Sequence, residues 1–210
     1  MKKLLIISTA VFLFFVAPGE VFAQKYKGQV VIGANGAFSL VGLTMNLAFD
    51  AIDSVQGLNA KTTPGLSGTV DFGITDRISL GIAHFYQGSK VTWNSYTDST
   101  SGNAVIFTGN FYAKILRQNT GVRALFHFGS NDNVDPYFGI RIGYSYWRVT
   151  SNVENIRRLA DFARLGNHLL PQAIFGIRYF FSPNIGVNGE FALGFPYYLS
   201  AGLNIRFGGQ

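Results

Sequence analysis

QAIFGIRYFFSPNIGVNGEFALG, residues 172–194, has the clearest pattern of strands in the chain and indicates the fold. It consists of two runs of alternating side chains on either side of a short turn, Ser182-Pro183-Asn184. Successive side chains of an extended strand point to opposite faces. One face of each run is apolar, whereas the other is small, rich in glycine and carries single charges such as Arg178 and Glu190. A closed barrel with lipid outside and a packed polar interior accounts for both faces.

The composition favours the same class of protein. Only 13% of the residues are charged and 48% are hydrophobic, whereas about 25% charged residues is usual for a soluble domain. The aromatic content of 15% and the 25 glycines suit lipid-facing strands, interfacial girdles and a narrow lumen. The chain has no cysteine, which excludes a disulfide framework and a thiolate metal site.

The N-terminal segment has the pattern of a secretory signal peptide. Lys2 and Lys3 precede an apolar run over residues 4–17, and Val21-Phe22-Ala23 supplies a cleavage site. The alternative is a transmembrane anchor, but the run is shorter than the roughly 20 residues that span a bilayer. We expect a signal peptide over residues 1–23 and a barrel domain over residues 24–210.

The alternation along the chain predicts eight strands. Helical spacing of apolar residues at 40–56 and 155–166 predicts partly helical loops, and the polar tract 94–103 is expected to be an exposed loop. The sequence therefore predicts an all-β, eight-stranded antiparallel up-and-down transmembrane β-barrel with partly helical external loops. The expected strands cover residues 28–38, 66–74, 78–93, 104–128, 136–149, 172–181, 185–194 and 197–207.

Loop lengths predict how the barrel is oriented. The connections between strands one and two, three and four, and five and six are long, whereas the others are short. Short turns of outer-membrane barrels lie on the periplasmic side and long loops lie outside. We expect both mature termini in the periplasm of a Gram-negative bacterium and the loops at the cell surface.

Two segments resemble a known family. DPYFGIRIGY at 135–144 and FGIRYFFSPNIG at 175–186 are similar to small outer-membrane β-barrel proteins of the OmpA-like type, notably those common in the Bacteroidetes. The resemblance covers residues 65–207 and implies an architecture but no activity. Such barrels often end on an aromatic residue, whereas Phe207 is followed here by Gly208-Gly209-Gln210.

The location sets the expected partners. Outer-membrane lipid, lipopolysaccharide and the barrel-assembly machinery are expected, together with an extracellular partner for the loops. The formal net charge is +6, but no basic run or stacking platform for nucleic acid is present. Attraction to anionic lipid head groups is the simpler account of the charge.

Charged residues on the inward faces form the first candidate site. An eight-stranded barrel is just wide enough for side chains to fill it, and buried charges have to be paired. We expect Glu190 to pair with one or more of Arg123, Arg141 and Arg178, as a structural plug or as a gate across a narrow channel. The expected lumen network comprises Asp71, Arg123, Arg141, Arg178, Glu190 and Arg206.

The expected rim of the barrel carries two further sets of residues. Arginines beyond the outer rim have the geometry to contact lipopolysaccharide phosphates, and aromatic residues anchor the barrel at the interfaces. The outer-rim basic residues are Arg148, Arg157, Arg158 and Arg164. The interfacial aromatic residues are Trp93, Tyr144, Tyr146, Tyr179 and Tyr197.

No catalytic, metal or cofactor site is predicted. The histidines, His84, His127 and His168, are scattered, and the sequence aligns no serine and carboxylate with any of them. We expect a structural or interaction role through the external loops. The alternatives are a narrow channel for small or hydrophobic solutes, a lipid A-modifying enzyme with a Ser-His-carboxylate cluster at the outer rim, and a secreted soluble barrel.

Overall fold

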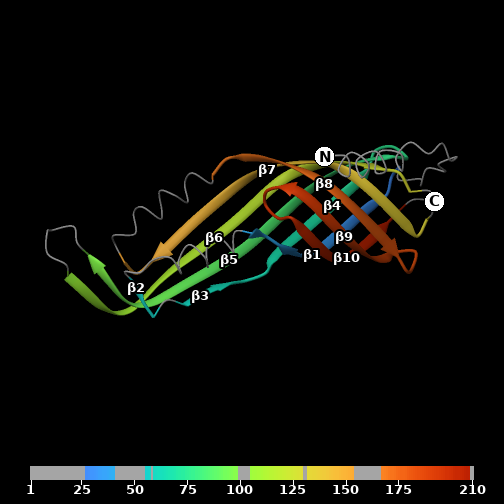
Figure 1. The fold of residues 1–210 in the computed structure, drawn as a ribbon. Helices are drawn as coiled ribbons and strands as arrows, with labels where there is room; N and C mark the ends of the chain where they lie inside the picture. The colour runs from blue at the N-terminus through green and yellow to red at the C-terminus, as the bar shows by residue number, and fades with distance from the viewer. Residues whose placement is uncertain are drawn as a thin grey trace, which may run out of the picture.

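The computed structural model describes residues 27–40, 55–57, 59–98, 105–129, 132–153 and 167–208 (Figure 1). The predicted signal peptide at 1–23 lies outside these residues. Within them the strands are β1 (Val30–Phe38), β2 (Val55–Gln56), β3 (Asn59–Thr62), β4 (Gly65–Gly73), β5 (Ile78–Asp98), β6 (Val105–His127), β7 (Val134–Ser151), β8 (Leu169–Phe180), β9 (Ile185–Gly194) and β10 (Leu199–Phe207).

The sheet closes on itself. In the described part of the chain, eight strands, β1 and β4 to β10, pair in the order β5-β4-β1-β10-β9-β8-β7-β6, and β6 pairs again with β5. Every pairing is antiparallel. The expected eight-stranded barrel is confirmed. Short β2 and β3 lie outside this ring, and within the described residues they pair with β5.

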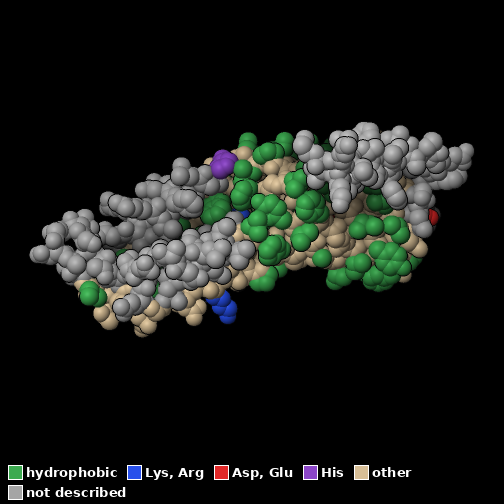
Figure 2. Space-filling model, in the orientation of Figure 1, with side chains coloured by type: hydrophobic (Ala, Val, Ile, Leu, Met, Phe, Trp, Pro, Cys, Tyr) green, Lys and Arg blue, Asp and Glu red, His purple; other side chains and the backbone are tan. Residues whose placement is uncertain are grey.

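Alternation of side chains sets the inside and the outside of the wall. On β1, Val31 is 2% exposed whereas Ile32 beside it is 43% exposed. Outward residues such as Val122 and Leu203 are about 60% exposed, and Figure 2 shows hydrophobic side chains gathered over the half of the molecule that contains the barrel. A continuous apolar surface of this kind is unfavourable in water. The outer surface is therefore the lipid-facing one, and a soluble barrel is the wrong reading.

Three strands are much longer than the rest. β5 has 21 residues, β6 has 23 and β7 has 18, whereas β1, β4 and β10 have nine each. Their excess length continues past the ring at the end opposite the start of β1 and the end of β10, together with β2 and β3 (Figure 1). We call this part the strand extension. It consists of residues 87–98 of β5, 105–117 of β6 and 147–151 of β7, together with β2 and β3.

The extension corrects one expectation. Asn94 to Asp98, expected to start an exposed loop, belong to β5 and pair with the start of β6 after a register shift between Trp93 and Ser95. Residues 114–119, which have no regular alternation of polar and apolar side chains, lie inside a continuous β6, within the strand expected over 104–128. Hydrogen bonding to β5 and β7 on both sides keeps these residues extended without a regular side-chain pattern.

Helical loops are not supported. Val55–Gln56, inside the first segment expected to be helical, forms strand β2. Residues 41–54 of that segment and all of 155–166 lie outside the described residues. Among the residues that are described, no helix is long and apolar enough to cross a membrane.

The start of β1 and the end of β10 meet at one end of the barrel. Val30 at the start of β1 is paired with Phe207 at the end of β10. The short connections after β4, β6 and β8 lie at this same end, because Ile78 pairs with Phe126 and Val134 pairs with Tyr179. We call it the terminal end, and the strand extension projects from the other end.

Candidate functional site

The centre of the lumen is occupied by an arginine between two carboxylates. Arg123 of β6 is enclosed, and its Nε lies 3.2 Å from Oδ1 of Asp71 on β4. Its Nη2 donates to Oε1 of Glu190 on β9 at 2.6 Å. Charge-assisted hydrogen bonds of this kind offset the large cost of burying ions. The three residues thus join β4, β6 and β9 through the inside of the barrel.

A second arginine extends this contact toward the terminal end. Nη2 of Arg178 on β8 donates to Oδ2 of Asp71, and its Nη1 lies 3.5 Å from Oδ2 of Asp135 on β7. The guanidinium also stacks over the ring of Tyr137, 4.7 Å from its centroid. Asp135 precedes the strand expected over 136–149, but β7 begins at Val134, so Asp135 shares the inward face with Tyr137.

Glu190 is satisfied by three donors. Besides Arg123, the hydroxyl of Tyr137 donates to its Oε1 and the hydroxyl of Tyr197 donates to its Oε2, each at 2.7 Å. Tyr137 fits only because its paired residue on the adjacent strand β8 is glycine. A Cβ on Gly176 would lie 2.4 Å from Cζ of Tyr137. Glycine at position 176 therefore makes room for the tyrosine ring that donates a hydrogen bond to Glu190.

Tyr197 corrects the expectation of an interfacial anchor. It lies in the tight connection between β9 and β10, where the strand alternation stops, and its side chain turns inward with 0% exposure. Trp93 is likewise buried, packed with Val91 and Ala113 on the inner side of the extension. By contrast, the other three expected anchors lie on the outer surface: Tyr144, Tyr146 and Tyr179, each 45–50% exposed.

At the terminal end, a serine, a histidine and an aspartate are connected in the order of a catalytic triad. Nε2 of His127 lies 2.8 Å from Oγ of Ser79, and its Nδ1 lies 2.8 Å from Oδ1 of Asp135. The three residues are at most 2% exposed. A nucleophilic serine needs space for a substrate carbonyl next to its oxygen. Because Ser79 is enclosed, this cluster acts as part of the lumen packing.

Sequence reasoning missed this cluster for a clear reason. The serine and the histidine are 48 residues apart, on β5 and β6, and meet only through the register that pairs Ser79 with Leu125. The sequence pattern indicated that both side chains point inward. It did not indicate that they lie at the same level along the barrel axis. Of the other histidines, His84 faces outward beside Thr120, and His168 is exposed.

The remaining arginines of the expected network have neutral partners. Nη2 of Arg141 donates to Oδ1 of Asn119 at 2.7 Å and to two backbone carbonyls. Arg206 lies at the terminal end, where it donates to the carbonyls of Pro183 and Asp132 and covers the ring of Phe180. Neither makes a described contact with a carboxylate, so both lie outside the network of ion pairs.

Arg117 is a further buried arginine that the sequence reasoning did not single out. Its Nη2 donates to Oγ of Ser39 at 2.7 Å, to Oε1 of Gln87 at 2.8 Å and to the carbonyl of Pro196 at 2.8 Å. The guanidinium also lies over the rings of Phe85 and Trp147. Arg117 therefore connects Ser39, the residue after β1, to Pro196 in the β9–β10 connection, next to Tyr197.

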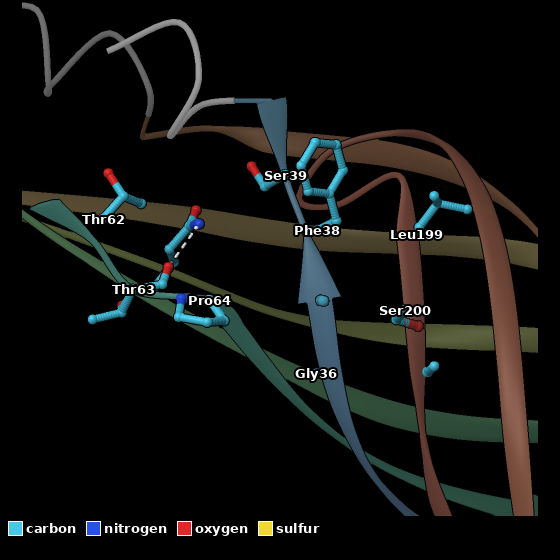
Figure 3. Close-up of a pocket in the computed structure, with 11 residues that line it drawn as sticks. Gly36, Phe38, Ser39, Thr62, Thr63, Pro64, Leu199 and Ser200 are labelled. Carbon is cyan, nitrogen blue, oxygen red and sulfur yellow. Dashed lines mark hydrogen bonds between the residues drawn. The ribbon is translucent and has the colours of Figure 1, made fainter. Parts of the chain in front are cut away.

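A hollow of about 770 Å³ lies at this end of the ring, between the ends of β1 and β10 and the β3–β4 junction (Figure 3). Outward residues such as Phe38 and Leu199 line it together with inward Ser39 and Gln87. Nε2 of Gln87 donates to the carbonyl of Thr63 at 3.2 Å. Arg117 binds both Ser39 and Gln87, two of the residues that line this hollow.

Of the expected outer-rim arginines, Arg148 is exposed on β7. Arg157, Arg158 and Arg164 lie outside the described residues. Within the described ranges, the acidic and histidine side chains form no group that could hold a metal ion.

Comparison with known proteins gives one family. The model of the outer membrane protein beta-barrel domain matches residues 8–207. The chain is similar in structure to the outer membrane protein OprG from Pseudomonas aeruginosa, with 11% sequence identity, a TM-score of 0.52, and coverage of 90% of this chain and 100% of that one. It is also similar to the N-terminal β-barrel domain of Pseudomonas aeruginosa OprF, with 12% identity, a TM-score of 0.47, and coverage of 86% and 98%. No curated protein sequence matches the chain.

Proposed function

The chain belongs to the family of outer membrane protein β-barrel domains, and from this premise we propose that it is a closed barrel with a structural or interaction role. In this proposal the lumen conducts no solute, and the barrel anchors the strand extension and the external loops at the cell surface. Both termini face the periplasm, because short connections of such barrels lie on that side. Lipopolysaccharide, outer-leaflet lipid and the barrel-assembly machinery are the proposed partners.

The single observation that carries the closed lumen is the continuous chain of contacts through it. Starting from Ser79, the contacts run through His127, Asp135, Arg178, Asp71, Arg123 and Glu190 to Tyr197. These residues come from strands β4 to β9 and from the β9–β10 connection. Eight-stranded barrels have only enough internal width for side chains, and here large paired side chains use it.

Planar lipid bilayer recordings test this proposal. We expect the wild-type protein to give no discrete ionic current, and Glu190→Ala to stay silent because Arg123 keeps Asp71 and the bulky neighbours stay in place. Migration of unboiled and boiled samples on a gel establishes that each inserted protein is folded. Stable current steps from the folded wild-type protein would contradict a closed lumen, and steps from Glu190→Ala alone would establish a gate.

The hollow beside β1 favours a second candidate function, the passage of small hydrophobic solutes. Its lining combines residues of the outer and the inner faces, which is the geometry that a lateral opening toward lipid requires. Ala201→Trp would fill the hollow from the outer face, whereas Ala34→Trp, also outward-facing on the neighbouring strand, lies outside it. If the hollow is a route, uptake of an apolar fluorescent solute into vesicles falls for Ala201→Trp only. Equal uptake by protein-free vesicles would exclude this function.

A further inference from the structure

A row of basic side chains crosses the outer face of the strand extension. In the strand register, Lys61 of β3 lies directly opposite Lys90 of β5, and Lys90 lies directly opposite Lys114 of β6. Arg148 of β7 is the partner of Leu116, two residues from Lys114 on the same face. All four side chains are exposed. We call these four residues the basic row.

This arrangement is unfavourable on its own. Like charges placed directly opposite each other on neighbouring strands destabilise a sheet, and here the middle lysine has a lysine on both sides. Among the described residues, no carboxylate forms an ion pair with any member of the row. Asp71, Asp135 and Glu190 are enclosed in the lumen. The described part of the fold therefore leaves the positive charge of the row without a counter-ion.

The position of the row identifies the source of that counter-ion. Tyr86 and Tyr146 end the apolar outer band on β5 and β7, and such aromatic residues mark the interface of a bilayer. Lys90 is four residues past Tyr86, or about 13 Å along the strand, and Arg148 is two residues past Tyr146, or about 7 Å. Both distances place the charges beside lipid head groups rather than at the far tip of the extension.

The surface is also shaped to receive a group. The four basic residues line one shallow hollow of about 420 Å³, together with Tyr86 and the hydroxyl-bearing Ser89 and Thr150. Ammonium and guanidinium groups with nearby hydroxyls are the donors that bind phosphate. We propose that the basic row is a binding site for phosphate groups of outer-leaflet lipid, the phosphorylated glycolipid of the outer membrane. This inference rests on the proposed function, in which the extension projects from the outer surface.

Binding of lipid A in detergent micelles, measured by native mass spectrometry, tests the site. The lipids are bisphosphorylated lipid A and the same lipid with both phosphates removed. The test variant carries Lys61→Gln, Lys90→Gln and Lys114→Gln, and a control variant removes two positive charges at the terminal end by Lys27→Gln and Arg77→Gln. A third variant, with arginine at positions 61, 90 and 114, keeps the charge. Heat-modifiable migration shows that every variant is folded.

We expect wild type, the control and the arginine variant to prefer the phosphorylated lipid, and the glutamine variant to bind it about tenfold more weakly or worse. Equal binding of both lipids by wild type, or equal binding by wild type and the glutamine variant, would overturn the site. The assignment to lipid would be overturned if inorganic phosphate alone saturates the basic row. It would also be overturned if a sulfated polysaccharide binds the row and lipid A does not. The bilayer recordings measure current through the lumen, so they can contradict the proposed function without contradicting this site, and the lipid measurements can do the reverse.

Discussion

Arg178 and Asp71 form an ion pair across the full width of the barrel. Arg178 lies on β8 and Asp71 on β4, and three strands separate β4 from β8 in either direction around the ring. The two side chains are therefore anchored on opposite walls. Since Asp71 also contacts Arg123, one carboxylate links three strands, which makes it the centre of the lumen network.

Removal of the charge at residue 71 should have a large effect. Asp71→Asn keeps the shape of the side chain but leaves Arg178 and Arg123 each short of one anionic partner. We expect the free energy of unfolding to fall by about 3–5 kcal/mol, as when one member of a buried ion pair is lost. Guanidinium unfolding in detergent micelles, followed by fluorescence of Trp93 and Trp147, measures this. Asp76→Asn, in an exposed turn, is the control, and equal midpoints for the two variants would disprove the role of Asp71.

Gly176 should not tolerate a side chain. An added Cβ would lie 2.4 Å from the ring of Tyr137, which is held by its hydrogen bond to Glu190. We expect Gly176→Ala to destabilise the barrel by about 1–3 kcal/mol through overpacking. Gly189→Ala is the matched control, because a Cβ there meets nothing within 4 Å. Unfolding midpoints that are the same for both variants would show that Tyr137 moves freely.

Ser79 should be unreactive despite its contact with His127. A fluorophosphonate probe is expected to leave the folded protein unlabelled, because Ser79 is fully enclosed. Ser79→Ala should cost about 1 kcal/mol of stability, the usual contribution of one hydrogen bond. A serine hydrolase treated in parallel confirms that the probe is active. Labelling that is lost in Ser79→Ala would instead establish a nucleophilic serine at the terminal end.

Reversing the charge of Lys90 should stabilise the extension in the absence of lipid A. Lys90→Glu would replace two repulsive cross-strand pairs, with Lys61 and Lys114, by attractive ones. We expect the free energy of unfolding in a nonionic detergent to rise by about 0.5–1 kcal/mol. The rise should be smaller in about 1 M salt, because exposed charges are then screened. Lys27→Glu is the control. A loss of stability at low salt would show that the three lysines do not repel one another.

Much of the fold could be predicted because its cause is local. A strand in a lipid-facing wall has to alternate, so Phe175, Ile177 and Tyr179 could be placed outside and Arg178 inside from sequence alone. The same parity places Trp93 inward, since Ile78 and Leu80 on its strand face outward. Tyr197 could not be placed in this way, because alternation ends with the strand and a tight connection follows.

The site depended on information that alternation does not contain. Sequence reasoning selected Asp71, Arg123, Arg178 and Glu190 as inward charges, and the structure joins these four. It also grouped Arg141 and Arg206 with them, although the former binds Asn119 and the latter binds turn carbonyls. Parity indicates which face a charge is on, but the height of each charge depends on how the strands are staggered.

Local alternation in the sequence was enough to predict a barrel, the number of strands in its wall and the side chains that face lipid. Which buried charges meet, the contacts among Ser79, His127 and Asp135, and the row of Lys61, Lys90 and Lys114 became visible only in the folded chain. The physical reason is the range of the interactions. Periodicity acts between neighbouring residues, whereas the stagger that closes a barrel is set by hydrogen-bond register between strands far apart in the chain.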